Sequence, residues 1–292
     1  MTMSSASSVP TTGGEFMYAD LRLLGPLEVV GSRGSVSFAG GRRRSVFALL
    51  ALRPGRLVSR SSLIDALWGD DAPATATKTL QGHIAQVRKA LSGAGLGGVL
   101  VTREPGYVLE VDPAQVDTHR FAEHVRAGCA ALDRGDGAEA HVRLEAGLAL
   151  WRGDPLADCA VAGWAVAELT RLCEARALAE EQTVTALLMA GRHADAVGEI
   201  ERLVGRYPSR ERLWELLMVA LHRSGRQADA LRTYRRVRSV LVEEFGVEPG
   251  PELRRLEAAV LAGEPDVATY LPRPPAGRRR ELSLADSRCA RP

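Results

Sequence analysis

The chain has 292 residues, a length that suits two compact domains better than one. Hydrophobic residues make up 46% of it, enough for real cores, and no apolar run approaches the roughly 18–20 residues of a membrane helix. The net charge of +2 is uneven: residues 20–112 hold 12 Arg or Lys against 8 Asp or Glu, whereas residues 113–263 hold 20 against 23. This asymmetry favours a nucleic-acid reader joined to a second domain, although so small an excess also occurs in domains that bind no anion.

The two ends of the chain and its cysteines give no indication of a catalytic or metal site. Residues 1–19 are rich in Ser and Thr and lack the apolar centre of a signal peptide, so we expect a disordered lead-in and a cytoplasmic protein. Residues 264–292 are rich in Pro and Arg and are expected to be a disordered tail. The four cysteines form no CxxC pair, which favours buried or idle thiols in a reducing compartment. We expect no metal and no cofactor.

Short apolar stretches open the first domain, which we place at residues 20–112. They lie at 21–24, 27–30 and 36–38, and Gly and Pro residues between them predict strands with tight turns. The run Val46–Leu52 follows three arginines and predicts a helix that stops before Pro54-Gly55. A second helix is expected after Ser59 or Ser61 as its N-cap and ends near Gly69.

The third expected helix, from about Thr77 to Leu91, is amphipathic. Its apolar residues are spaced four, three and four apart and therefore share one face: Leu80, Ile84, Val87 and Leu91. Two strands, 99–101 and 107–109, follow with a tip at 102–106. Three helices followed by a hairpin predict a winged helix-turn-helix, in which the third helix enters the major groove.

In such a fold the polar face of the third helix reaches base edges and the flanking segments contact phosphates. Lys78 lies near the end that would enter the groove, and Gln86 is suited to adenine. Arg103 at the hairpin tip is suited to a narrow minor groove. The expected DNA-contacting residues are Arg42, Arg43, Arg44, Thr77, Lys78, Thr79, Gln81, His83, Gln86, Arg88, Lys89, Thr102, Arg103 and Tyr107.

Plainer interpretations of these residues stay open. A polar helix face is usually just solvated, and the three arginines from Arg42 to Arg44 can simply start a surface helix. His83 can be merely exposed, and Thr102 can be only a strand residue. Arg88 is suited either to guanine or to a phosphate.

From about Asp117 the strand signals stop and helices follow one another. We expect them at 119–132, 138–150, 166–189, 193–206, 210–223, 227–245 and 251–262. The segment Gly191–Ala196 recurs at Gly225–Ala230, a shift of 34 residues, which is the tetratricopeptide period. The expected fold class is therefore mainly α with a small β component, a winged helix followed by an all-α, tetratricopeptide-like domain at 117–263.

The segment Thr79–Leu91, with His83-Ile84 and Arg88-Lys89, resembles the recognition helix of the OmpR/PhoB-type effector domain. The segment 101–107, which ends in Gly-Tyr, resembles the wing of that domain but is a residue shorter than in the response regulators. The resemblance implies a small four-stranded sheet before the first helix. No receiver domain precedes the reader, so phosphorylation of an Asp is not expected.

Residues 150–156, 210–213, 221–231 and 244–253 resemble the bacterial transcriptional activator domain. This pair of domains is the plan of the Streptomyces antibiotic regulatory protein family. The resemblance implies activation of a secondary-metabolite gene cluster, binding of double-stranded promoter DNA at direct repeats near the −35 element, and contact with RNA polymerase. It also suggests a side-by-side homodimer on DNA. The loop with Asp70 and Asp71 would face the sigma factor, or it is an ordinary helix-ending turn.

Two other classes of function are compared with this one. A helical-repeat adaptor or ligand-binding regulator would use the winged domain for protein contacts rather than for DNA. An enzyme is disfavoured because the sequence shows no nucleophile–base pair, no metal-ligand spacing and no phosphate-binding loop.

Overall fold

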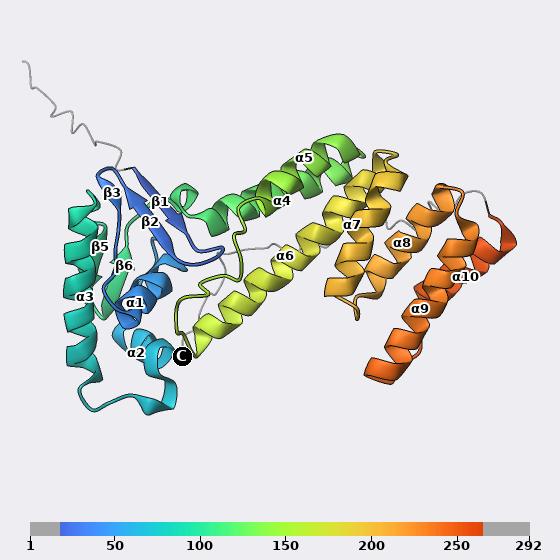
Figure 1. Ribbon diagram of the computed structural model, residues 1–292. Helices are drawn as coiled ribbons and strands as arrows, with labels where there is room; N and C mark the ends of the chain where they lie inside the picture. Colours follow the sequence, from blue (N-terminus) through green and yellow to red (C-terminus); the bar gives the residue numbers. More distant parts are fainter. Residues whose placement is uncertain (1–17, 265–292) are drawn as a thin grey trace, which may run out of the picture. The chain divides into compact units, whose positions relative to one another are not determined.

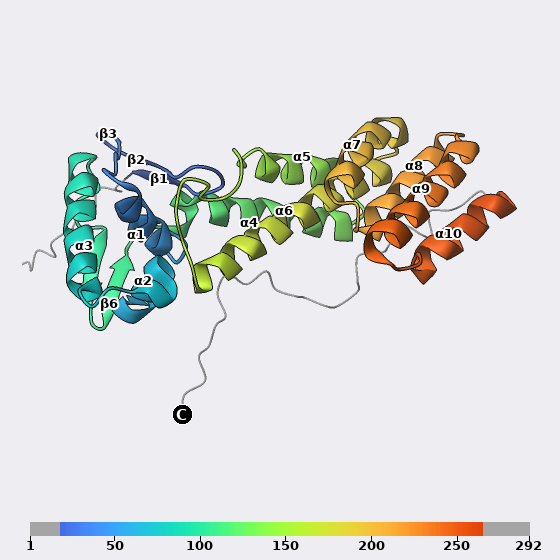
Figure 2. The same cartoon turned by 60° about the horizontal axis from the view of Figure 1, so that its bottom comes forward.

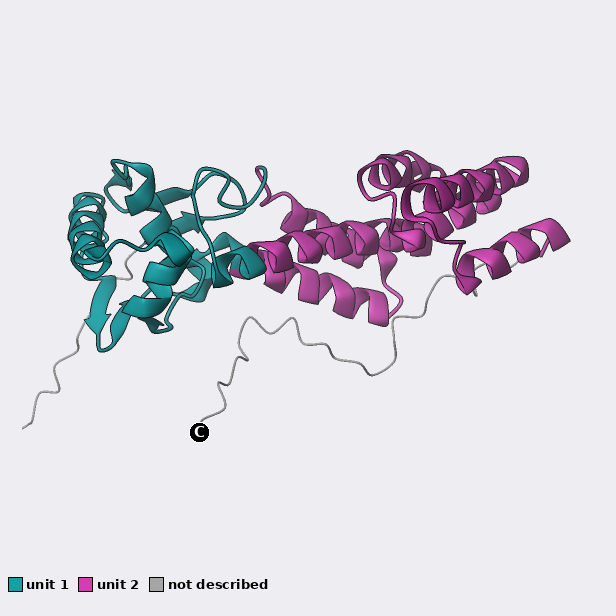
Figure 3. Ribbon diagram, turned by 90° about the horizontal axis from the view of Figure 1, so that it is seen from below, with its two compact units in different colours: residues 1–118, 153–168 teal, residues 119–152, 169–292 magenta. Residues whose placement is uncertain are grey.

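The computed structural model describes residues 18–264, which form two compact units. Within the described residues, the first unit contains 18–118 together with Gly153–Glu168, and the second contains His119–Arg152 and 169–264 (Figure 3). Disorder was expected at 1–19 and 264–292. Except for residues 18, 19 and 264, these segments lie outside the described range. The mixed first unit and the all-helical second unit confirm the predicted fold class.

The first unit opens with an antiparallel sheet in the order β1-β2-β3 (Figure 1). Its strands are β1 Ala19–Arg22, β2 Glu28–Gly31 and β3 Gly34–Ser35. Among the described residues before the first helix there are thus three strands, not the four that the resemblance implied, although Leu21 also bridges to Val116. The third strand ends at Ser35, although the Val36 N–H still donates to the Val29 carbonyl oxygen at 2.8 Å. Phe38 is buried and stacks on Phe47 with 5.1 Å between ring centroids.

Three helices follow: α1 Gly41–Ala51, α2 Arg60–Trp68 and α3 Ala76–Gly93. Helix α1 begins five residues before the expected start at Val46, so the three arginines lie inside its first turns. Ser59 is the N-cap of α2, and its hydroxyl accepts a hydrogen bond from the Ser62 backbone N–H. Both α1 and α2 pack against α3.

A second sheet has the order β4-β6-β5, with β4 Val58–Ser59, β5 Leu100–Arg103 and β6 Gly106–Leu109. Arg103 pairs with Gly106, so the hairpin tip is only residues 104 and 105 rather than the expected 102–106. Gly106 is required here: a Cβ at this position would lie 2.0 Å from the Val58 carbonyl oxygen of β4. The short 3-10 helix η2 Pro113–Gln115 then leads out of the sheet.

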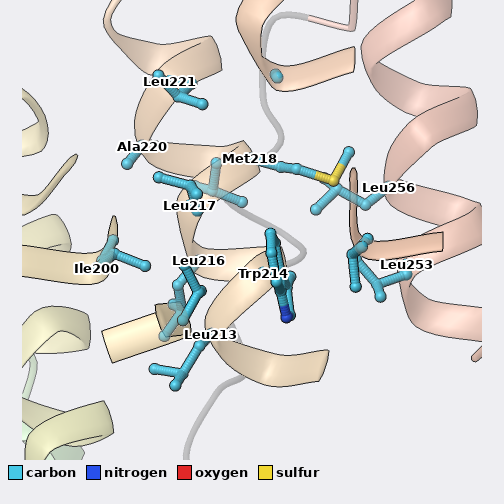
Figure 4. Packing of buried hydrophobic residues seen from close by; sticks show 14 of the residues in the cluster. Ile200, Leu213, Trp214, Leu216, Leu217, Met218, Ala220, Leu221, Leu253 and Leu256 are labelled. Atoms are coloured by element: carbon cyan, nitrogen blue, oxygen red, sulfur yellow. The ribbon is translucent and has the colours of Figure 1, made fainter. Parts of the chain in front are cut away.

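Seven helices follow in the described chain, and their bounds agree closely with those expected from the sequence. They are α4 Asp117–Asp133, α5 Gly137–Leu148, α6 Trp164–Met189, α7 His193–Arg206, α8 Glu211–Arg223, α9 Gln227–Phe245 and α10 Pro251–Ala262. The core of the last four lies around α8. Figure 4 shows Trp214 and Met218 directed towards Leu253 and Leu256 of α10, while Ile200 of α7 lies on the other side.

The 34-residue repeat corresponds to two turns of the same geometry. Gly191 and Gly225 both have φ of +76°, a conformation that favours glycine. The following arginine behaves alike in each: Arg192 donates to Asp195 at 2.9 Å, and Arg226 donates to Asp229 at 2.7 Å. The repeated motif therefore forms the turn that starts the second helix of each helical pair, α7 in one and α9 in the other.

Candidate nucleic-acid interface

Helix α3 divides into a buried and an exposed face. Leu80, Ile84, Val87 and Leu91 are at most 2% exposed, because they pack on the core of the first unit. Figures 1 and 2 show α3 beside the β5–β6 hairpin. The opposite face is exposed and makes no hydrogen bond or ion pair to other described residues through its longer polar side chains: Lys78, Gln81, Gln86 and Lys89. Thr77 is exposed as well, whereas Thr79 and His83 are half-buried.

Arg88 has a different position from its neighbours on α3. Its Nε donates to the Leu100 carbonyl oxygen at 2.9 Å, and its Nη2 donates to Thr102 Oγ1 at 2.8 Å. Both acceptors belong to β5, so this side chain joins the helix to the hairpin. The guanidinium therefore fixes the wing relative to α3, a role that the helical pattern alone did not reveal.

Tyr107 lies beneath this junction. It is 3% exposed, so its ring packs inside the protein, and a contact between Tyr107 and DNA stays a prediction. The Arg60 and Arg88 guanidinium carbons lie 5.8 and 5.9 Å from the centroid of its ring, within cation–π range. The ring of Tyr107 therefore packs against the guanidinium groups of both arginines.

Arg60 and Glu104 hold the hairpin tip against α2. Two nitrogens of Arg60 donate to the two carboxylate oxygens of Glu104 at 2.7 and 2.6 Å. This bond lowers the pKa of Glu104 and raises that of Arg60. Sequence reasoning missed the pair, because its members are 44 residues apart and only the folded hairpin brings them together. Arg103 is exposed and pairs with Glu110 at 2.6 Å.

The three arginines at the start of α1 point to different neighbours. Arg42 donates to the Leu67 carbonyl oxygen and lies 5.1 Å from the centroid of the Trp68 ring. Arg44 pairs with Asp158 at 2.8 Å, so the structure gives it a protein partner where a phosphate was expected. Arg42 and Arg43 lie close enough to His83 for their charge to act on it. The pKa of His83 is lowered, first by burial and then by these two arginines.

Asp70 and Asp71 lie in η1 Gly69–Asp71, a 3-10 turn between α2 and α3. Both side chains are exposed. The turn begins at Gly69, which is also the C-cap of α2 and has φ of +55°. The two carboxylates are thus accessible to a partner, and the geometry is equally that of a helix-ending turn.

Comparison with known proteins agrees with this arrangement. Residues 39–109 match the family described as transcriptional regulatory protein, C terminal, and residues 116–261 match the bacterial transcriptional activator domain. The chain is 39% identical over 263 residues to Regulatory protein DnrI of Streptomyces peucetius, covering 88% of this chain and 97% of that protein. Transcriptional regulator RedD of Streptomyces coelicolor is 38% identical over 265 residues, covering 88% and 75%.

The chain belongs to the Streptomyces antibiotic regulatory protein family. It is a DNA-binding transcription regulator with a winged helix and an activator domain. A solved structure titled Mycobacterium tuberculosis EmbR in complex with low affinity phosphopeptide is 34% identical, with a TM-score of 0.82 over 86% of this chain and 67% of that one.

The matched segments do not coincide with the two compact units. The winged-helix match ends at residue 109 and the activator-domain match begins at 116, yet residues 153–168, inside the second match, pack with the first unit. The predicted boundary between domains at 112 and 117 stays a prediction. Within residues 18–264 no helix combines the length and apolarity needed to cross a bilayer, and no cluster of three or more His, Cys, Asp or Glu forms a potential metal site.

Proposed function

We propose that this family member binds promoter DNA by inserting α3 into the major groove. The observation that carries the proposal is the exposed face of α3, whose long polar side chains have no partner among the described residues while its other face is fully buried. A helix fits the major groove, and glutamine can form two hydrogen bonds with adenine there. Gln81 and Gln86 are therefore assigned to base edges, and Lys78 and Lys89 to phosphates.

The basic residues beside α3 extend this surface. Arg42, Arg43 and His83 lie together where α1 starts next to α3, which suits a phosphate on one side of the groove. Arg88 and Thr102 act indirectly by fixing the wing, from which Arg103 can reach the neighbouring minor groove. For Arg44 the pairing with Asp158 favours a structural role.

Substitution separates base contacts from phosphate contacts. Gln86→Ala should weaken binding to the specific site by about 1–3 kcal/mol and leave non-specific binding almost unchanged. Lys78→Ala should weaken both and reduce the slope of log K against log salt concentration by about one. Arg134→Ala removes an exposed charge far along the chain and serves as the control. Parental binding by the Gln86 and Lys78 variants would show that α3 does not read DNA.

We further propose that the protein activates a secondary-metabolite gene cluster by contacting RNA polymerase, with Asp70 and Asp71 facing its sigma factor. The exposure of both carboxylates between α2 and α3 supports this assignment. In a promoter-reporter assay, Asp70→Ala with Asp71→Ala should lose activation and keep DNA affinity. Unchanged activation by this double variant would remove the turn from the polymerase contact.

A further inference from the structure

The segment Gly153–Glu168, here called the strap, lies outside the winged-helix match but packs with the first unit (Figure 3). At its start, the Leu156 N–H donates to the carbonyl oxygens of Leu23 and Gly25 at 3.0 and 2.8 Å. Leu156 is 1% exposed and has φ of +54°, a conformation that costs free energy unless the surroundings hold it. Among the described residues it is the one non-glycine with positive φ. The strap is thus held in a defined position from its first turn.

Asp158 makes the central contacts of the strap. One carboxylate oxygen accepts from the Leu27 backbone N–H at 2.8 Å, and the other accepts from Arg44 Nη1 at 2.8 Å. The first bond is to the turn after β1, and the second is to α1. Next to it, burial and the Asp158 charge raise the pKa of Cys159 to about 12, so this thiol stays protonated. A single carboxylate therefore joins the sheet and α1 through the strap.

The end of the strap contacts α2. The Ala162 N–H donates to the Ala66 carbonyl oxygen at 2.8 Å, and Trp164 Nε1 donates to the Ser62 carbonyl oxygen at 3.2 Å. The Arg53 guanidinium lies 3.8 Å from the centroid of the Trp164 ring. Arg53 lies two residues after the end of α1, so these contacts fix α2 relative to the end of α1.

We infer that the strap is a positioning element for DNA reading, and that Asp158 is its principal positioning residue. The inference rests on the proposed function. Helices α1 and α2 support α3, and the strap holds both of them together with the sheet, although no strap residue belongs to the exposed face of α3. The DNA-reading unit therefore consists of residues 18–118 and 153–168. Helix α6 begins in the strap and continues into the second unit. The DNA-reading unit is therefore completed by a segment from the part of the sequence that is otherwise helical.

Full-length Asp158→Ala, Asp158→Asn and Asp154→Ala test the inference. Asp154 is an exposed strap residue whose side chain makes no hydrogen bond to described residues, so it is the matched control. Removing an acidic charge should by itself slightly favour DNA binding. We expect the opposite for Asp158→Ala: a loss of about tenfold or more for the specific site, with the salt slope unchanged because no phosphate contact is lost. Asn should restore only part of the affinity: its amide oxygen can still accept from Leu27, but its NH2 group cannot accept the hydrogen bond from Arg44.

Two measurements keep the outcome clear. Hydrogen exchange at the Leu27 amide reports whether the contact between the strap and Leu27 is broken. If Asp158→Ala does not fold, Trp164→Phe is used in its place, because it removes the bond to Ser62 and keeps an aromatic ring. Faster exchange at Leu27 combined with parental DNA affinity would overturn the inference. So would parental affinity in Trp164→Phe when exchange at Ala162 is accelerated. If the parent protein itself binds no promoter DNA, the proposed function is wrong. This result differs from failure of the inference, in which the parent binds DNA and the variants bind it equally well.

Discussion

Arg88 and Gln86 lie two positions apart on α3, yet they have different surroundings. Gln86 is exposed and makes no hydrogen bond to described residues, whereas Arg88 directs two nitrogens to Leu100 and Thr102 of the wing. A guanidinium with several donors in one plane is suited to joining two elements in this way. Helical spacing alone placed both residues on the polar side. Only the folded hairpin shows that one of them contacts the protein.

His83 gives the reader a pH dependence with a defined sign. Burial and the charges of Arg43 and Arg42 lower its pKa, so the free protein disfavours the protonated ring, and the free energy of unfolding falls as pH falls through and below about 6.5. A nearby phosphate reverses this effect and raises the pKa. DNA binding should therefore take up a proton and strengthen as pH falls from about 8 to about 6.

Fluorescence anisotropy with the promoter fragment across this pH range measures the effect. His83→Gln, which keeps hydrogen-bonding capacity but does not titrate in this range, should bind with a flatter pH dependence than the parent. The same pH dependence in both proteins would mean that His83 does not face a phosphate.

At the scale of elements, the wing depends on close contact between β4 and β6. Gly106→Ala would place a Cβ 2.0 Å from the Val58 carbonyl oxygen and 2.7 Å from the Ser59 Cα, both backbone atoms that cannot turn away. We expect a loss of roughly 1–3 kcal/mol in the free energy of unfolding of the first unit. Gly97→Ala is the matched control, because its nearest contact is 3.5 Å, an ordinary van der Waals distance. Urea titration that gives equal midpoints for the two variants would contradict this account of Gly106.

The sequence predicted the elements well where the signal was local. The apolar spacing of α3, the cap at Ser59 and the repeated glycine turns at 191 and 225 all depend on neighbours along the chain, and all appear in the structure. The end of the third strand and the hairpin tip were wrong because they depend on contacts across the fold, such as Phe38 on Phe47 and Arg103 opposite Gly106. The strap had no local signal, because its partners lie about a hundred residues earlier.

At the scale of the whole molecule, the chain combines a DNA-reading unit with a helical unit, and the first is completed by a strap from the second half of the sequence. Two copies that bind direct repeats would lie head to tail on DNA and not related by a two-fold axis. Such an arrangement requires that the two half-sites lie on the same face of the duplex. Their centres must therefore be about one helical turn apart, or a whole number of turns. We propose this side-by-side pair as the form that recruits polymerase.

Footprinting of the full-length protein on the promoter regions of the genes next to its own tests most directly whether α3 reads promoter DNA. We expect protection of two directly repeated half-sites near a −35 element, and loss of this protection when Gln81 and Gln86 are both replaced by alanine. Absence of protection by the parent at low salt, or an unchanged footprint with the double variant, would contradict it.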